Sequence, residues 1–109
     1  MVNAEERYKH FVRAVTDSQS LWTLKNDVGW ATWDDSDGDT VFPVWSDREG
    51  ASRAALTTWH GYELAEFLDD VLQPLRDSEF WVRVNPDDKL LGIDLSCNYF
   101  REVLGKGDA

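Results

Sequence analysis

The sequence predicts an α+β fold, in which a mainly antiparallel sheet of about five strands carries helices packed on one face. Helical and strand patterns fall in runs, in the order α-β-β-β-α-α-β-β-α, whereas a parallel sheet of βαβ units would alternate them. With 42% hydrophobic and 13% aromatic residues, the 109 residues can fill one core without metals or disulfides. We therefore expect a single domain over residues 1–109, with an ordered core at about residues 4–104.

The first predicted element is an amphipathic helix at residues 3–17. Asn3 is the expected N-cap, with Glu6 completing a loose capping box. The apolar positions recur at the helical spacing i, i+3, i+4 and i+7, so the helix should dock by one aromatic-rich stripe. This stripe consists of Tyr8, Phe11, Val12 and Val15.

Three strands are expected next, at residues 21–25, 29–33 and 40–45. Turn-forming residues separate them, among which the acidic cluster at residues 34–39 has the length of a hairpin loop. Consecutive strands with such turns predict a three-stranded meander. Pro43 lacks an N–H donor, so the third strand is expected at a sheet edge or with a bulge.

Two helices should follow. The pattern Ser46-x-x-Glu49 is a capping box that predicts a helix at residues 47–59, with Gly61 ending it at about His60. A second helix is expected from about Glu63, where leucine, valine and phenylalanine recur at helical spacing. Pro74 should end or kink its last turn.

The last elements are two strands and a helix. Residues 79–84 alternate Val82 and other apolar residues on one face with Trp81 and Arg83 on the other, which predicts a strand with one core face and one half-solvated face. A turn at residues 85–88 leads to a fifth strand at residues 91–95. Ser96 should cap a final helix that reaches about Leu104.

Charge and targeting signals exclude several classes. The chain has 21 acidic and 11 basic residues, a net charge of −10, which weighs against nucleic-acid binding. The single cysteine, Cys97, cannot form an intrachain disulfide and suits a reducing compartment. Residues 1–10 have no apolar stretch typical of a signal peptide, and the longest apolar run has only five residues, so neither secretion nor a membrane span is expected. A cytoplasmic protein is the resulting expectation.

No catalytic or metal-binding motif stands out. In the acidic cluster at residues 34–39, placing Gly38 at loop position 6 of an EF-hand puts Trp33 and Val44 where acidic ligands are required. His10, His60 and Cys97 lack the spacing of a zinc site, and Cys97 is expected to be a small buried residue in the first turn of the last helix. We therefore predict no catalytic residue, no metal and no cofactor, although an enzymatic role stays open.

The tryptophans are more informative. There are 6 in 109 residues, more than one face of a small sheet can bury. Trp30 and Trp33 have opposite parity on one expected strand and cannot share a face. One of them should point away from the helices, as should Trp81 beside Arg83, and aromatic residues with arginine are typical of interface hot spots. The alternative is that these rings cover a second small core.

Several short segments together resemble an uncharacterised bacterial family, domain of unknown function 2750. The resemblance extends from about Glu6 to Leu104, and it implies a small cytoplasmic protein without any assigned activity, ligand or catalytic residue. The chain departs from the family pattern by a shorter segment after Tyr62 and by Cys97 in place of a proline. The segments that carry the resemblance are Glu6-Arg7-Tyr8, Leu21-Trp22-Thr23-Leu24, Gly29-Trp30, Pro43-Val44-Trp45-Ser46, Trp59-His60-Gly61-Tyr62, Phe67-Leu68 and Val82-Arg83-Val84-Asn85-Pro86.

Two functions from different classes follow. The first is a small acidic non-enzymatic binding protein, such as an inhibitor, an immunity-like protein or an adaptor, whose exposed tryptophan surface engages a protein partner or a second copy. The second is a small-ligand or enzymatic domain with a pocket between the second helix and the sheet, with Arg83 or His60 as its polar group. The residues expected to line that pocket are Trp30, Trp45, Trp59 and Tyr62.

Overall fold

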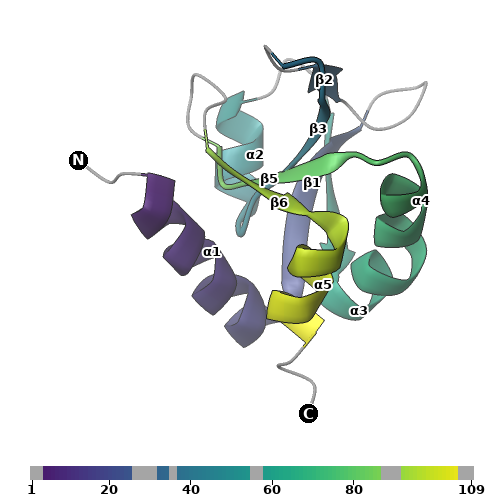
Figure 1. Cartoon of the computed structure of the whole chain (residues 1–109). Coiled ribbons are helices and arrows are strands. Elements are labelled where there is room, and N and C mark those ends of the chain that lie inside the picture. The colour runs from purple at the N-terminus through teal and green to yellow at the C-terminus, as the bar shows by residue number, and fades with distance from the viewer. Residues whose placement is uncertain (1–3, 26–31, 35–36, 55–57, 87–91, 106–109) are drawn as a thin grey trace.

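The structure is a computed structural model that describes residues 4–25, 32–34, 37–54, 58–86 and 92–105 (Figure 1). Helices and strands are mixed along the described chain, which confirms the predicted α+β class. The helices are α1 (Ala4–Ser18), α2 (Arg48–Ala54), a continuous segment of α3 (Leu64–Glu66), the π-helical turn η1 (Phe67–Val71) and α4 (Leu72–Asp77), and α5 (Cys97–Gly105). The strands are β1 (Ser20–Lys25), β2 (Trp33–Asp34), β3 (Thr40–Val44), β4 (Thr58–Glu63), β5 (Trp81–Val84) and β6 (Ile93–Ser96).

The strands form two sheets instead of the single antiparallel sheet that we predicted. One has four strands in the order β2-β3-β5-β6, and its central pair, β3 and β5, is parallel. The other is an antiparallel pair of β1 and β4. A bridge between Trp22 and Trp45 joins β1 to the end of β3. The three-stranded meander was therefore wrong, because β1 takes β4 as its partner and only β2 and β3 form the expected hairpin.

The strand β4 occupies residues for which the end of a helix was predicted. Helix α2 ends at Ala54, and Trp59, His60 and Tyr62 belong to a strand, in agreement with the β propensity of aromatic residues. Gly61 is not a helix stop: a Cβ atom there would lie 2.7 Å from the Trp22 ring, so the close approach of this ring requires a glycine. The start of α2 also differs from the prediction, because Asp47 Oδ1 accepts a hydrogen bond from the Gly50 N–H (2.6 Å) and is the cap in place of Ser46.

The helix predicted from about Glu63 is present, and Pro74 does not end it. The helix widens just before the proline, where the Leu72 N–H bonds to the Phe67 carbonyl, five residues back. The Arg101 guanidinium of α5 donates to the Leu68 carbonyl in this turn. The helix then continues through Pro74 to Asp77, and the widened turn lies directly before the proline, whose missing N–H interrupts the regular hydrogen-bond pattern there.

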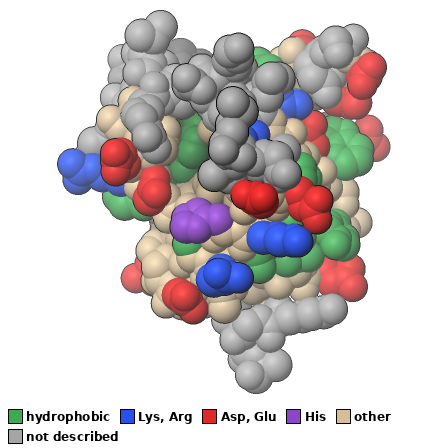
Figure 2. Space-filling view, turned by 90° about the vertical axis from the view of Figure 1, so that its left-hand side faces the viewer, with side chains coloured by type: hydrophobic (Ala, Val, Ile, Leu, Met, Phe, Trp, Pro, Cys, Tyr) green, Lys and Arg blue, Asp and Glu red, His purple; other side chains and the backbone are tan. Residues whose placement is uncertain are grey.

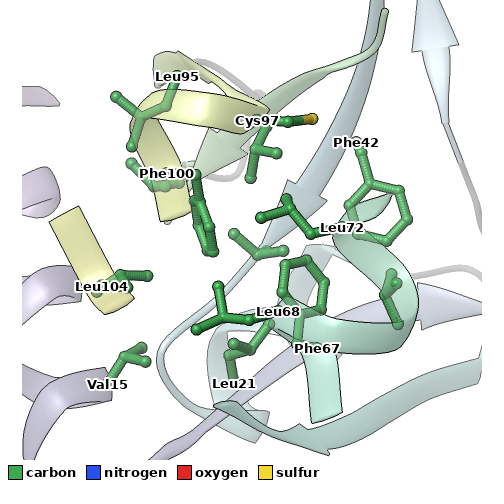
Figure 3. Packing of buried hydrophobic residues seen from close by; sticks show 14 of the residues in the cluster. Val15, Leu21, Phe42, Phe67, Leu68, Leu72, Leu95, Cys97, Phe100 and Leu104 are labelled. Carbon is green, nitrogen blue, oxygen red and sulfur yellow. The ribbon is translucent and has the colours of Figure 1, made fainter. Parts of the chain in front are cut away.

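The main core lies between one face of the four-stranded sheet and the helices α1, α3–α4 and α5 (Figures 1 and 3). Phe67 is central to it, with ring centroids 5.5 Å from that of Phe100 and 6.1 Å from that of Phe42 (Figure 3). The sheet supplies alternate residues of its strands to this core. These residues are Phe42, Val44, Val82, Val84 and Leu95.

A second buried set lies on the opposite side of the strands. Leu24, Val41, Trp45 and Ala51 are all buried but lie outside the main core. Helix α2 packs on β1 and β4 at this side, and Figure 1 shows it apart from the other helices. The expectation that all helices share one face is therefore wrong for α2.

Pro43 lies inside the sheet, since β3 is flanked by β2 and β5. The pairing with β2 stops at Val41, however, so Pro43 has a ladder partner, Arg83, on one side only. On the other side its carbonyl accepts a hydrogen bond from the buried Thr23 hydroxyl (2.8 Å). The strand as a whole is not at the edge of the sheet, so the predicted edge position is wrong. Among the described residues, Pro43 itself has no strand partner on one side, which is the condition that a proline without an N–H requires.

Candidate functional site

The side of the four-stranded sheet away from the main core carries a row of large and charged side chains. The register pairs Trp33 with Val41, Val41 with Trp81, and Arg83 with Asp94, and residues paired in this way point to the same face. We call Trp33, Trp81, Arg83 and Asp94 the open outer face, of which Trp81 is the exposed member while the Arg83 and Asp94 side chains are 12% and 25% exposed. Helix α2 lies over the neighbouring strands β1 and β4.

Arg83 contacts two other members of this face, Asp94 and Trp33. Its Nε and Nη2 donate to the two carboxylate oxygens of Asp94, at 2.6 and 2.9 Å, which is the bidentate geometry that arginine forms best. On its other side the guanidinium carbon lies 5.8 Å from the centroid of the Trp33 ring. Since β3 separates Trp33 from Arg83, the ring extends over β3, which agrees with the complete burial of Val41 beneath it.

Trp81 is the exposed member of the open outer face. Its exposed fraction is 37%, whereas Val82, the next residue, is fully buried in the main core. This alternation agrees with the prediction that Trp81 and Arg83 lie opposite the core face of their strand. Among the described residues, one other large hydrophobic side chain is exposed, Tyr99 at 48%, and it lies on α5 in the helical layer.

The described residues that were expected to line a pocket do not form one cluster as the residues of the open outer face do. Trp45 is 3% exposed, and its Nε1 donates to the Pro86 carbonyl at 3.1 Å. The Tyr62 ring packs against the main core and lies 4.6 Å from the His60 ring. Trp30 and the side chain of Trp59 lie outside the described residues. The pocket therefore stays a prediction, and Trp45 belongs to the second buried set.

Two segments that carry the family resemblance meet at Asn85, which follows β5. Its Oδ1 accepts from the Ser46 N–H (2.8 Å), and its Nδ2 donates to Ser46 Oγ (3.1 Å) and to the Arg7 carbonyl (3.5 Å). Arg7 Nε donates in return to the Asn85 carbonyl (3.2 Å). Asn85 has a φ of +43°, a conformation that asparagine tolerates better than most residues. This cluster ties α1 to the ends of β3 and β5, and its role is structural.

Sequence reasoning missed two members of the open outer face. It left open which of Trp30 and Trp33 points away from the helices, and it did not pair Arg83 with Asp94. The predicted turn gave no signal for the ion pair: a hairpin turn at residues 85–88 would set residue 83 opposite residue 90, whereas the observed register pairs Arg83 with Asp94. The structure makes Trp33 the partner of the Arg83 guanidinium.

Cys97 is buried in the first turn of α5, as predicted, and its Sγ–H donates to the Phe80 carbonyl at 3.3 Å. Burial raises the pKa of this thiol, and the nearby Arg76 guanidinium opposes that effect more weakly. Burial and the raised pKa both disfavour the thiolate, which is the reactive form of cysteine, and the side chain packs in the main core.

This raised pKa gives a prediction for pH and labelling. The neutral thiol is favoured in the folded chain, so its contribution to stability is fully present below the pKa of an unfolded cysteine and is lost as the pH rises through the higher folded value. We expect Ellman's reagent at pH 8 to react markedly more slowly with the native chain than with the chain in denaturant, because the side chain is buried and the raised pKa disfavours the thiolate. Equal rates would contradict the buried position.

The acidic cluster at residues 34–39 does not form a metal site in the part that the structure describes. Asp34 Oδ1 accepts a hydrogen bond from the Thr40 hydroxyl (2.8 Å), which closes the hairpin between β2 and β3. Residues 35 and 36 lie outside the described residues. No group of three or more His, Cys, Asp or Glu side chains within the described ranges could hold a metal ion.

Charge is spread over the described surface. Figure 2 shows one side of the molecule, where acidic and basic side chains are interspersed and hydrophobic ones are scattered among them. Lys9 and Glu5 on α1 form an exposed ion pair, 3.4 Å apart, which contributes little to stability. No described helix is both long and apolar enough to cross a membrane.

Comparison with known proteins gives one match. Residues 8–104 match the model of a family described as "Protein of unknown function (DUF2750)". No curated protein and no solved structure matches the chain. The match covers nearly all of the described residues, including the open outer face.

Proposed function

The chain belongs to the family of proteins of unknown function DUF2750, a membership that assigns no activity, and from the open outer face we propose that it is a small non-enzymatic binding protein. The observation that carries the proposal is Trp81, 37% exposed beside an arginine that is already held in place. Tryptophan and arginine are enriched among the residues that dominate the binding energy of interfaces. The partner is proposed to be a protein.

The rigidity of the face supports this role. Arg83 is fixed from two sides, by Asp94 and by the Trp33 ring, so it loses little side-chain freedom when a partner binds. All four residues stand on strands of a sheet whose other face is the main core. A surface of this kind needs no rearrangement to present its aromatic side chain.

The chemistry of the described residues favours binding over catalysis. Arg83 is neutralised by Asp94, and the Cys97 thiol is buried with a raised pKa. We propose a cytoplasmic location for the same reason, since a lone buried thiol suits a reducing compartment. An inhibitor, an immunity-like protein or an adaptor would each fit this description.

Replacing Trp81 by alanine tests the proposal. We expect the variant to fold, with a loss of about 1–3 kcal/mol in the free energy of unfolding, because most of this large side chain still packs on the sheet. Capture of a partner from the host extract should fall at least tenfold, in line with a hot spot of about 1.4 kcal/mol or more. Quantitative mass spectrometry of wild-type and variant pull-downs measures this ratio.

The matched control is Tyr99→Ala, which removes the other exposed large hydrophobic side chain among the described residues. It should retain the captured protein, because Tyr99 lies on α5 and not on the open outer face. Loss with both variants, or with neither, would contradict the proposed site. Gel filtration of the isolated chain tests for a second copy on the same face, and a dimer that Trp81→Ala dissolves would replace the partner protein by self-association.

A further inference from the structure

The carboxylates near Trp81 indicate the chemistry of the partner. We infer that the open outer face takes a basic segment of a protein, with an arginine or lysine stacked on the Trp81 ring and neighbouring basic groups against these carboxylates. The inference rests on the proposed function, because it names the partner for the same surface. The partner is thus expected to carry positive charge and to contact Trp81 with an arginine or a lysine.

The register brings the carboxylates to the Trp81 end of the sheet. Trp81 pairs with Val41 near the start of β3, so the turns that precede β3 and β5 lie at the same end of this parallel pair. Asp34 pairs with Thr40 and points to the opposite face, so it is not part of this group. Glu79 lies two residues before Trp81, in the turn that leads into β5, and Asp37 and Asp39 lie in the turn that leads into β3. The side chains of these acidic residues are exposed.

Two described basic residues belong to the same region. Arg83 is paired with Asp94 at 2.6 Å, so that pair contributes no net charge. Arg76, on the exposed surface of α4, precedes Glu79 by one turn. At this end of the sheet the exposed acidic residues Glu79, Asp37 and Asp39 outnumber Arg76, and the whole chain has a net charge of −10.

A second copy of the chain fits this surface poorly. In a two-fold dimer the same patch meets itself, so Glu79 and Asp39 would face the carboxylates of the other copy. Like charges placed together at an interface cost binding energy. A basic partner meets the same groups favourably, and a cation over a tryptophan face gains further attraction. The opposite charges also speed the encounter.

The experiment uses a defined probe, a capped heptapeptide in which three arginines alternate with glycines, and a second heptapeptide with glutamates in their place. Binding is followed by ¹⁵N chemical shifts of the whole chain at low and at physiological salt. We expect the arginine peptide to shift the Trp81 indole N–H and the backbone of β5, with weaker binding at the higher salt. The glutamate peptide should shift neither.

Two charge variants separate a local site from general attraction. Glu79→Gln and Glu66→Gln each remove one negative charge, but Glu66 lies on α3 in the helical layer. Glu79→Gln should weaken the arginine peptide about threefold, as expected for one charge at roughly 6 Å in water, and Glu66→Gln should change it less. Trp81→Ala should abolish the binding. Equal effects of the two charge variants, or shifts spread over the whole surface, would overturn the inference.

The two proposals fail differently. If Trp81→Ala loses the host partner but the arginine peptide leaves the Trp81 signals unchanged, the partner's charge is wrong and the binding surface stands. If Trp81→Ala captures the host partner as well as the wild type does, the binding surface itself is wrong, whatever the peptide does.

Discussion

Phe67→Ala should lower the free energy of unfolding by about 4 kcal/mol, the largest loss that we expect from one substitution in this chain. The Phe67 ring is fully buried and lies between the rings of Phe42, Phe100 and Tyr62, at centroid distances of 6.1, 5.5 and 6.1 Å. Removing it loses the transfer free energy of the ring and leaves a cavity in the centre of the core. Domains of this size have a total stability of about 5–15 kcal/mol.

Urea denaturation followed by far-ultraviolet circular dichroism measures this loss. Phe67→Leu is the control, since a smaller change of volume should cost about 1.5 kcal/mol or less. If the alanine and leucine variants are equally stable, the core does not depend on this ring. A variant that is unfolded without denaturant agrees with the prediction, and in that case the leucine variant gives the quantitative comparison.

Asn85→Ala is expected to cost about 3 kcal/mol, although it removes only a polar side chain. The substitution breaks the hydrogen bonds to the Ser46 N–H and hydroxyl and to the Arg7 carbonyl, each contributing about 1 kcal/mol. It also leaves a β-carbon at a φ of +43°, where alanine is less favourable than asparagine.

Glycine at position 85 separates these two causes. Asn85→Gly loses the same side-chain hydrogen bonds but adopts the positive φ without strain, so it should be about 1 kcal/mol more stable than Asn85→Ala. Thermal and urea unfolding of both variants measure the difference. Equal stability of the glycine and alanine variants would rule out backbone strain, and wild-type stability of both would rule out the whole cluster.

The local elements of the fold were more predictable than their pairing. Helix α1 follows from its apolar stripe, and the Ser96 hydroxyl caps α5 by accepting from the Tyr99 N–H (3.1 Å), as expected. The predicted helix through Trp59 was wrong. The alanines of α2 are followed closely in sequence by the aromatic residues of β4, and only the pairing of β4 with β1 decides where the helix ends and the strand begins. The parallel pair β3–β5 likewise depends on contacts far apart in sequence.

The candidate site was predictable only in part for the same reason. Alternation along β5 was enough to place Trp81 and Arg83 on one face and Val82 on the other. Alternation could not predict the partners of Arg83, because Asp94 and Trp33 come from two other strands, one on each side of β5. Trp45 was expected at a surface or in a pocket, but a contact with Pro86, 41 residues away, buries its indole.

The separation of the aromatic residues has a spectroscopic consequence. The main core holds the rings of Phe11, Phe42, Phe67 and Phe100, while the described tryptophan side chains of Trp22, Trp33, Trp45 and Trp81 belong to the other side of the strands by register. Their indole emission therefore reports on that side of the molecule, and circular dichroism at 222 nm reports chiefly on the helical layer. Coincident unfolding curves from the two signals would mean that both sides unfold as one cooperative unit.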